Sequence, residues 1–243
     1  MISRLLLAAI AALGLVSGTS SAAPQRPVSS KAAPAKPAAA AQVSATAYGG
    51  ALIGNPKART RLVEYISFTC PHCADFARES AGSINTEFVG PGTTSVEIRP
   101  YVRNTLDYAA SLLASCGGPR KYVANYNALL ADQPQWMAKA QAVPAARQQA
   151  WLAKGLSTGA PLIAADTGMT TLMRSRGFTV VQINRCLTDP KAQAALQSGY
   201  THANDVDRIP GTPSFTIDGK LVADTSDWAA LRPELIKATA RKR

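Results

Sequence analysis

The sequence predicts an α/β fold in which a parallel βαβ unit precedes a long helical insertion, a hairpin and a closing helix. The first observation is a strand pattern at 62–68, rich in β-branched and aromatic residues, that leads into an amphipathic helical pattern at 74–88. The second is an alternating strand pattern at 94–101, which completes the crossover of a βαβ unit. The third is the region at about 104–204, where the patterns are helical.

Glycine and proline residues divide the helical region into several helices. We predict a helix at 104–115, because Gly117-Gly118-Pro119 follows it, and another at 180–187, because Asp189-Pro190 follows it. Further breaks are expected at Pro134, Gly155, Gly159-Ala160-Pro161 and Gly177.

A hairpin and a helix are predicted after the helical region. Asp218-Gly219-Lys220 supplies turn residues between strands at 214–217 and 221–223. A helical pattern at 228–240 follows the hairpin.

The N-terminal residues have the pattern of a cleavable secretory signal. Arg4 lies in a short positive segment before an apolar run at 5–16 and several small residues, which predicts a signal peptide at 1–22 with cleavage after Ala22. The apolar run is shorter than the roughly 20 residues of a membrane-spanning helix. An uncleaved signal that tethers the protein is the alternative. We therefore expect an exported, periplasmic protein.

The segment after the signal differs in composition from the rest of the chain. Residues 23–47 are rich in Ala, Pro, Ser and Lys and have no apolar periodicity, which predicts a flexible linker. The region at 48–243 is long enough for one domain with a substantial core that carries a large insertion.

The chain is strongly basic, with a formal net charge of +11. Its basic residues are scattered, and the only dense cluster is Arg241-Lys242-Arg243. Aromatic residues do not alternate with them as a nucleic-acid stacking platform requires. We therefore expect no nucleic-acid partner and attribute the charge to solubility and weak attraction to acidic surfaces.

Cys70-Pro71-His72-Cys73 is the motif that carries chemistry. Two thiols at this spacing form either a redox disulfide or half of a zinc site, and the flanking residues favour redox because the motif lies between a strand and a helix. The first turn of a helix has unpaired N–H groups and a positive dipole end, which stabilise an anionic Cys70 sulfur. Pro71 suits the first helical position. A zinc site with Cys70, Cys73 and His202 lacks a fourth ligand.

The other two cysteines, Cys116 and Cys186, lie in separate helical patterns. A disulfide between them closes a loop of about 70 residues and, in the chain-entropy model, contributes on the order of 4 kcal/mol. Two buried free thiols are the alternative, since free cysteine is a common core residue.

The cysteine motif, the preceding Glu64-Tyr65-Ile66-Ser67-Phe68 and the later Gly211-Thr212-Pro213-Ser214-Phe215 together resemble the DsbA-like thiol-disulfide oxidoreductases of the thioredoxin superfamily. The resemblance covers roughly 47–240. About 140 residues separate Cys73 from Pro213, a spacing that distinguishes the DsbA-like branch. The resemblance implies a thioredoxin fold with a large inserted helical domain at about 104–204, and an active site where the two meet.

The resemblance also implies roles for the motif residues. Cys70 is the expected nucleophile, activated by the helix dipole and the His72 imidazole, and Cys73 is the expected partner in the disulfide. Pro213 is expected in the cis form, with the backbone of Thr212 binding an extended peptide by strand addition. Threonine at this position departs from the best-known oxidases of the family, which carry valine, and is frequent among disulfide isomerases and in other DsbA-like branches.

Glu64 is the remaining candidate catalytic residue. A carboxyl group inside an apolar strand is expected to be partly buried, where desolvation raises its pKa and lets it relay protons near Cys73. Exposure at the strand edge is the alternative.

The leading functional hypothesis is an exported, monomeric oxidase that donates the Cys70–Cys73 disulfide to reduced or unfolded secreted proteins. A DsbB-like membrane quinone reductase is the expected reoxidant, and no cofactor beyond the redox-active disulfide, and no metal, is expected. One alternative is a disulfide isomerase or reductase kept reduced by a membrane thiol donor. Another is a non-catalytic peptide-binding chaperone module.

Overall fold

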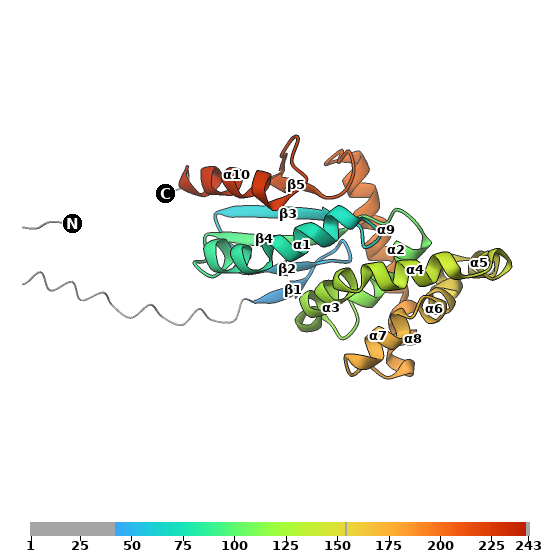
Figure 1. The fold of residues 1–243 in the computed structure, drawn as a ribbon. Helices are drawn as coiled ribbons and strands as arrows, with labels where there is room; N and C mark the ends of the chain where they lie inside the picture. Colours follow the sequence, from blue (N-terminus) through green and yellow to red (C-terminus); the bar gives the residue numbers. More distant parts are fainter. Residues whose placement is uncertain (1–41, 154, 242–243) are drawn as a thin grey trace, which may run out of the picture. The chain divides into compact units, whose positions relative to one another are not determined.

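Strand β3, Thr60–Ile66, lies near the centre of a mixed sheet in the computed structural model (Figure 1). The structure describes residues 42–153 and 155–241. Within these residues six strands form one sheet in the order β1-β2-β4-β3-β5-β6. Strands β3 and β4 pair in parallel, and the other neighbouring strands pair antiparallel.

The elements in chain order are β1 (Val43–Ala45), β2 (Ala51–Ile53), β3 (Thr60–Ile66), α1 (Pro71–Ser83), the π-helical segment η1 (Ile84–Val89), β4 (Thr94–Pro100), α2 (Thr105–Ala114), α3 (Pro119–Ala131), α4 (Gln133–Ala142), α5 (Ala145–Leu152), α6 (Leu156–Asp166), α7 (Met169–Ser175), α8 (Val180–Leu187), α9 (Pro190–Asp205), β5 (Ser214–Ile217), β6 (Lys220–Leu221) and α10 (Trp228–Ala240).

The predicted βαβ unit consists of β3, α1 with η1, and β4. The parallel register runs from Thr60 opposite Thr94 to Ile66 opposite Pro100. The helix begins at Pro71, three residues before the predicted start. Proline suits this position because its φ is already helical, and because the N–H group that it lacks would have no acceptor within the first turn. The active-site turn therefore leads directly from β3 into α1.

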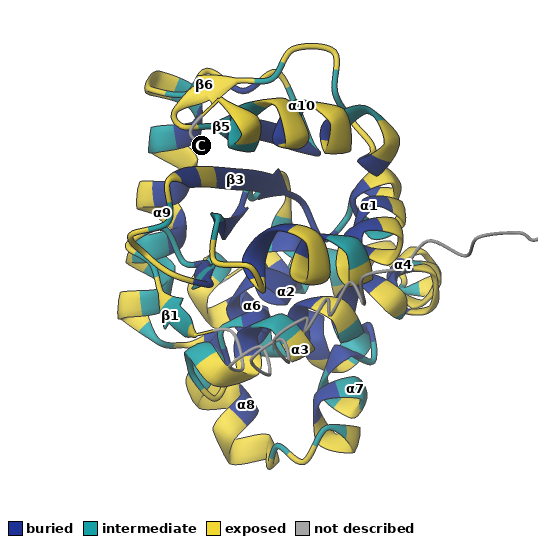
Figure 2. Cartoon of the chain, turned by 90° about the vertical axis from the view of Figure 1, so that its left-hand side faces the viewer, coloured by how far each residue is buried: buried dark blue, intermediate teal, exposed yellow. Residues whose placement is uncertain are grey.

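The side chains of β3 alternate between two cores. Leu62 and Ile66 belong to the main core on the side of α1 and α10, which also contains Phe76 of α1. Val63 and Tyr65 point the other way and pack with residues of α9 and the loop after it. Figure 2 shows β3 buried along most of its length, while α10 alternates buried and exposed residues. Glu64 lies between Leu62 and Ile66 in the alternation and so shares their face.

The helical region predicted at about 104–204 corresponds to α2–α9, with one difference inside it. Gly159-Ala160-Pro161 does not separate two helices, as predicted, but lies within the single helix α6. A Cβ atom on Gly159 would lie 1.7 Å from the carbonyl oxygen of Trp151, so glycine permits the close approach of α5 and α6. Burial of Ala160, Ile163 and Ala164 along the same helix offsets the cost of an internal proline.

The folded region begins before the predicted domain boundary at residue 48, because β1 spans Val43–Ala45. Val43–Ala45 pairs with β2, and this long-range pairing gives strand structure to residues whose composition suggested a linker. The other residues of the predicted linker, except Gln42, Thr46 and Ala47, and the whole signal peptide at 1–22 lie outside the described residues. None of the described helices is long and apolar enough to cross a membrane.

The hairpin turn has two residues. Ile217 pairs with Lys220, and Asp218 and Gly219 between them have φ values of 52° and 79°. Positive φ at both central residues is the geometry of a type I′ turn, which matches the twist of the strands. Strand β6 is shorter than predicted and ends at Leu221.

Candidate active site

Cys70 is the N-cap residue of α1, with extended backbone angles of −91° and 119°, and Pro71 follows in the first turn. Cys73 lies one helical turn further on and is fully buried, and Cys70 is 3% exposed. The motif thus places one sulfur at the positive end of a helix and the other beneath it in the core. Both are free thiols in this structure.

The cysteine motif meets a segment that is distant in sequence. The Thr212-Pro213 peptide bond is cis, as the family resemblance implied. Cys70 Sγ donates to the carbonyl oxygen of Thr212 at 3.1 Å. On the inner side, the backbone N–H of Ser67 donates to Cys73 Sγ at 3.5 Å. The structure therefore brings together Cys70, Cys73 and the Thr212-Pro213 segment, as the sequence analysis expected.

The two thiols have opposite acid strengths. The hydrogen bond from the Cys73 thiol is the largest influence that lowers the pKa of Cys70, to about 4, and the backbone N–H groups of Cys73 and His72 add to it. Burial raises the pKa of Cys73 well above its ordinary value, and the Cys70 charge raises it further. At neutral pH the reduced site is therefore a Cys70 thiolate that accepts a hydrogen bond from a neutral Cys73.

Three further predicted residues surround the sulfurs. Pro71 and His72 are exposed beside Cys70, and His72 contributes a backbone N–H to the stabilisation of the thiolate. The hydroxyl of Thr212 is buried and lowers the pKa of both cysteines. A Cys70 thiolate can no longer donate to the Thr212 carbonyl, and it is the anionic form of Cys70 that this hydroxyl stabilises.

Glu64 is 4% exposed, in line with the expectation of a buried carboxyl group. Burial raises its pKa to about 8, so it is mostly protonated at neutral pH. Burial also raises the pKa of Tyr126 in α3, and the charges of Glu64 and Cys73 add to that effect. Both groups therefore lie within electrostatic range of the same buried tyrosine.

Two residues of the helical region hold the active-site turn and were missed by the sequence analysis. Asp107 of α2 is fully buried and accepts from the N–H of Phe68 at 2.8 Å. Gln133 of α4 donates its side-chain amide to the carbonyl oxygens of Phe68 at 2.6 Å and Cys70 at 2.9 Å. Burial raises the pKa of Asp107 to about 6. The local signals near them were Asn104, which caps α2 through the N–H of Asp107, and the predicted break at Pro134, and neither indicates a contact with the turn.

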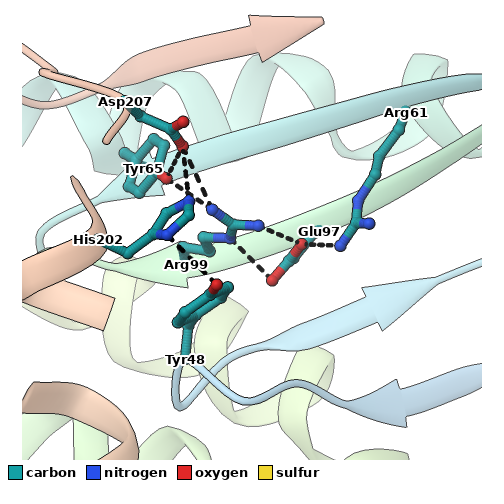
Figure 3. A network of polar contacts seen from close by, with 7 residues as sticks. All are labelled: Tyr48, Arg61, Tyr65, Glu97, Arg99, His202 and Asp207. Carbon is teal, nitrogen blue, oxygen red and sulfur yellow. Dashed lines mark hydrogen bonds and ion pairs between the residues drawn. The ribbon is translucent and has the colours of Figure 1, made fainter. Parts of the chain in front are cut away.

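A second polar cluster lies on the other face of β3 and β4 (Figure 3). Arg99 is at its centre, with Nε 2.8 Å from Glu97 Oε1 and Nη1 3.3 Å from Asp207 Oδ2. Glu97 also pairs with Arg61, and the Tyr65 hydroxyl donates to Asp207. The structure shows Arg99 buried and paired on two sides.

His202 of α9 joins the same cluster rather than the cysteines. Its Nε2 lies 3.5 Å from Asp207 Oδ2, and its Nδ1 lies 3.3 Å from the Tyr48 hydroxyl. Among the residues that the structure describes, no three potential metal-ligating side chains form a group. Asp207 begins the loop that leads to Thr212-Pro213, so the cluster anchors this loop to the sheet.

Cys116 and Cys186 form a disulfide, with a Cα–Cα distance of 5.5 Å. Cys116 follows α2 and Cys186 lies in α8, so the bond joins the first part of the helical region to a late one. It is separate from the Cys70 and Cys73 thiols. The chain thus contains one structural disulfide and one dithiol.

Comparison with known proteins agrees with the geometry of this site. A family model described as thioredoxin matches residues 46–238. The protein-disulfide isomerase of Novosphingobium aromaticivorans is 35% identical, with a TM-score of 0.75 over 80% of this chain and 99% of that one. The chain therefore belongs to the thioredoxin superfamily, in its DsbA-like branch of thiol-disulfide oxidoreductases.

Proteins of lower sequence identity are also similar to this chain. Wolbachia pipientis α-DsbA1 has a TM-score of 0.60 at 19% identity, over 78% of this chain and 90% of that one, and this likeness shows the fold. A Rickettsia prowazekii (strain Madrid E) protein with the provisional name protein-disulfide oxidoreductase is 24% identical over 69% of this chain. That match covers 54% of the relative, so the chain spans about half the length of the curated relatives it matches.

Replacement of Thr212 by valine keeps the shape of the side chain and removes its hydroxyl. We predict that Thr212→Val raises the pKa of Cys70 by about half to one unit, because one donor to the thiolate is lost. Ultraviolet absorbance of the thiolate, followed as a function of pH in the reduced protein, measures this pKa.

Thr216→Val is the matched control. The Thr216 hydroxyl in β5 is also buried and has no hydrogen-bond partner among the described residues, and Thr216 is not among the groups that shift the pKa of either cysteine. An unchanged Cys70 pKa in Thr212→Val, or an equal shift in both variants, would show that the Thr212 hydroxyl does not stabilise the thiolate.

Glu64 makes the stability of the oxidised protein depend on pH. Its folded-state pKa of about 8 lies above the unfolded value of about 4.3, so the folded state keeps a proton that the unfolded state loses. We predict that stability declines between about pH 4 and pH 8, by on the order of a few kcal/mol. Cys70 does not titrate in the disulfide form and adds nothing to this decline.

Urea unfolding of the oxidised protein across this pH range tests the prediction. Glu64→Gln is expected to have a flatter stability profile and a gain in stability at pH 8, because no carboxylate is buried there. Parallel profiles for the two proteins would contradict a buried, protonated Glu64.

Proposed function

We propose that this chain is an exported thiol-disulfide oxidase that donates its Cys70–Cys73 disulfide to proteins with reduced cysteines. The observation that carries the proposal is the Cys70 sulfur at the start of α1, stabilised as an anion by Cys73 and two backbone N–H groups. Stabilisation of the reduced thiolate makes the disulfide a strong oxidant. A low-pKa thiol is also a good leaving group.

The reaction consists of two exchanges. A client thiolate attacks Cys70 Sγ, the Cys70–Cys73 bond breaks, and a mixed disulfide forms between the client and Cys70. Cys73 leaves as a thiolate and takes a proton, for which Glu64 is the proposed source. A second client thiolate then attacks the client sulfur of the mixed disulfide, and Cys70 leaves as its stabilised thiolate. The client loses two electrons and the cysteine pair gains them.

Thr212 and Pro213 are the proposed client-binding segment. The segment lies against Cys70, and its backbone precedes β5, so an extended client chain can pair beside it by strand addition. Reduced or unfolded secreted proteins are the proposed clients. A DsbB-like membrane quinone reductase is the proposed reoxidant, and we propose that the protein acts as a monomer.

A disulfide isomerase or reductase is the second candidate function. The 35% identical neighbour from Novosphingobium carries the name protein-disulfide isomerase. The family resemblance adds that threonine at the position of Thr212 is frequent among disulfide isomerases and in other DsbA-like branches. The two functions differ in the direction of electron flow, which the reduction potential of Cys70/Cys73 determines.

The reduction potential tests the oxidase proposal. In glutathione buffers the oxidase is expected to have a value near about −120 mV, whereas a value near about −270 mV would place the protein with the reductases. A Cys116→Ala, Cys186→Ala variant leaves one couple to titrate. Cys73→Ser, after oxidised glutathione has converted its Cys70 to a glutathione mixed disulfide, is expected to exchange with a reduced client protein. The client thiolate attacks Cys70 Sγ, glutathione leaves as its thiolate, and the client–Cys70 disulfide accumulates. Cys70→Ser treated in the same way is not expected to do so, since it lacks the attacked sulfur.

We also propose that the protein is exported to the periplasm through the signal at 1–22. The n-region with Arg4, the short apolar run and the small residues before Ala22 support this. Expression of the full chain followed by cell fractionation and intact-mass measurement tests it. Recovery of a species that begins at Ala23 in the periplasmic fraction is the expected result, and full-length protein in the cytoplasm would overturn it.

A further inference from the structure

The helical region contacts the active-site turn through side chains that the exchange reaction does not use. The turn from Ser67 to Cys70 connects β3 to α1 and is closed by the Cys70 N–H donating to the Ser67 carbonyl at 3.2 Å. Its two carbonyl groups at Phe68 and Cys70 face Gln133, which is 5% exposed. A primary amide has two hydrogens, and here both have acceptors in the turn.

The peptide groups before and after Phe68 are both hydrogen-bonded by side chains of the helical region. Gln133 binds the Phe68 carbonyl, and Asp107 accepts from the Phe68 N–H. Asp107 is itself held, because the Arg103 N–H donates to its second oxygen at 3.0 Å. Asn104 adds a bond from its amide to the Thr69 hydroxyl at 3.0 Å. The turn thus has little freedom to rotate relative to α2 and α4.

The orientation of this turn determines where the donors of α1 point. The Cys70 carbonyl accepts from the N–H groups of Cys73 at 3.1 Å and Ala74 at 3.3 Å, so it forms part of the first turn of α1. Gln133 binds the same carbonyl. The N–H groups of His72 and Cys73 that act on the Cys70 sulfur belong to this first turn. A rotation of the Cys70 peptide therefore moves these donors relative to the sulfur.

We propose that Gln133 is a positioning residue for the reactive thiol, which it holds in place by donating its amide to the carbonyl groups of Phe68 and Cys70. The helical region then has a role in the chemistry besides covering the sheet, since it sets the geometry of the thiolate site. The importance of this role for turnover rests on the proposed function. The geometric effect on Cys70 does not.

The first variant is Gln133→Met, which keeps a side chain of similar length and removes both donors. The carbonyl groups of Phe68 and Cys70 then each lose the hydrogen bond from Gln133 while they stay buried. We expect their peptide groups to rotate toward other hydrogen-bond donors. The expected result is a rise of about half to one unit in the pKa of Cys70, and a roughly three- to tenfold shift of the glutathione equilibrium toward the disulfide form. Thiolate absorbance and redox equilibration measure the two quantities.

Gln148→Met is the matched control. Gln148 also donates its side-chain amide to two carbonyl groups, of Ala140 at 3.3 Å and Val143 at 2.9 Å, but these lie within the helical region. Loss of this amide is expected to lower the melting temperature and to leave the Cys70 pKa and the redox equilibrium unchanged. The comparison separates positioning of the thiol from general stability.

Gln133→Asn keeps the test decisive if Gln133→Met does not fold. Asparagine keeps the amide, but it is one methylene shorter and cannot reach both carbonyl groups, so a smaller shift in the same direction is expected. A destabilised Gln133 variant with the wild-type Cys70 pKa and redox equilibrium would overturn the proposal. The pKa is a property of the reduced protein alone, so a failure of the oxidase proposal leaves this test intact.

Discussion

The hydrogen bond between the two active-site sulfurs is the interaction on which the rest of the site depends. Burial keeps Cys73 neutral, and a neutral Cys73 is the donor that most stabilises the Cys70 anion. The bond requires one sulfur at the end of a helix and the other in the core beneath it. The short Cys-Pro-His-Cys spacing, the proline in the first turn and the packing of Cys73 together satisfy this requirement.

The two faces of strand β3 lie in different environments beneath the site. On one face Glu64 lies among apolar side chains, where its proton is retained at neutral pH. On the other face Tyr65 joins the ionic cluster around Arg99, which holds the loop that leads to Thr212. Because side chains alternate along a strand, a single short segment supports both Glu64 and the loop before Thr212 without placing the ions near the thiols.

Sequence analysis could predict the features that have local signals and missed those that depend on long-range contacts. The cysteine motif, the Thr212-Pro213 segment and the helices at 180–187 and 228–240 have recognisable residues at short spacing. Asp107 and Gln133 contact residues 39 and 65 positions away, and in sequence they look like ordinary polar residues of helices. Strand β1 depends on its pairing with β2 rather than on a local strand signal. Glycine at position 159 serves the close contact with the backbone of Trp151 and does not end a helix.

The edges of the sheet have a consequence for the proposed encounter with unfolded client chains. Strand β1 has three residues and β6 has two, so each edge offers few unpaired backbone groups to another polypeptide. Long exposed edges template the non-specific pairing that leads to aggregation. With such short edges, an incoming strand finds little to extend at the two ends of the sheet. For the proposed partly folded clients, the short edges therefore lower the tendency to co-aggregate with this protein.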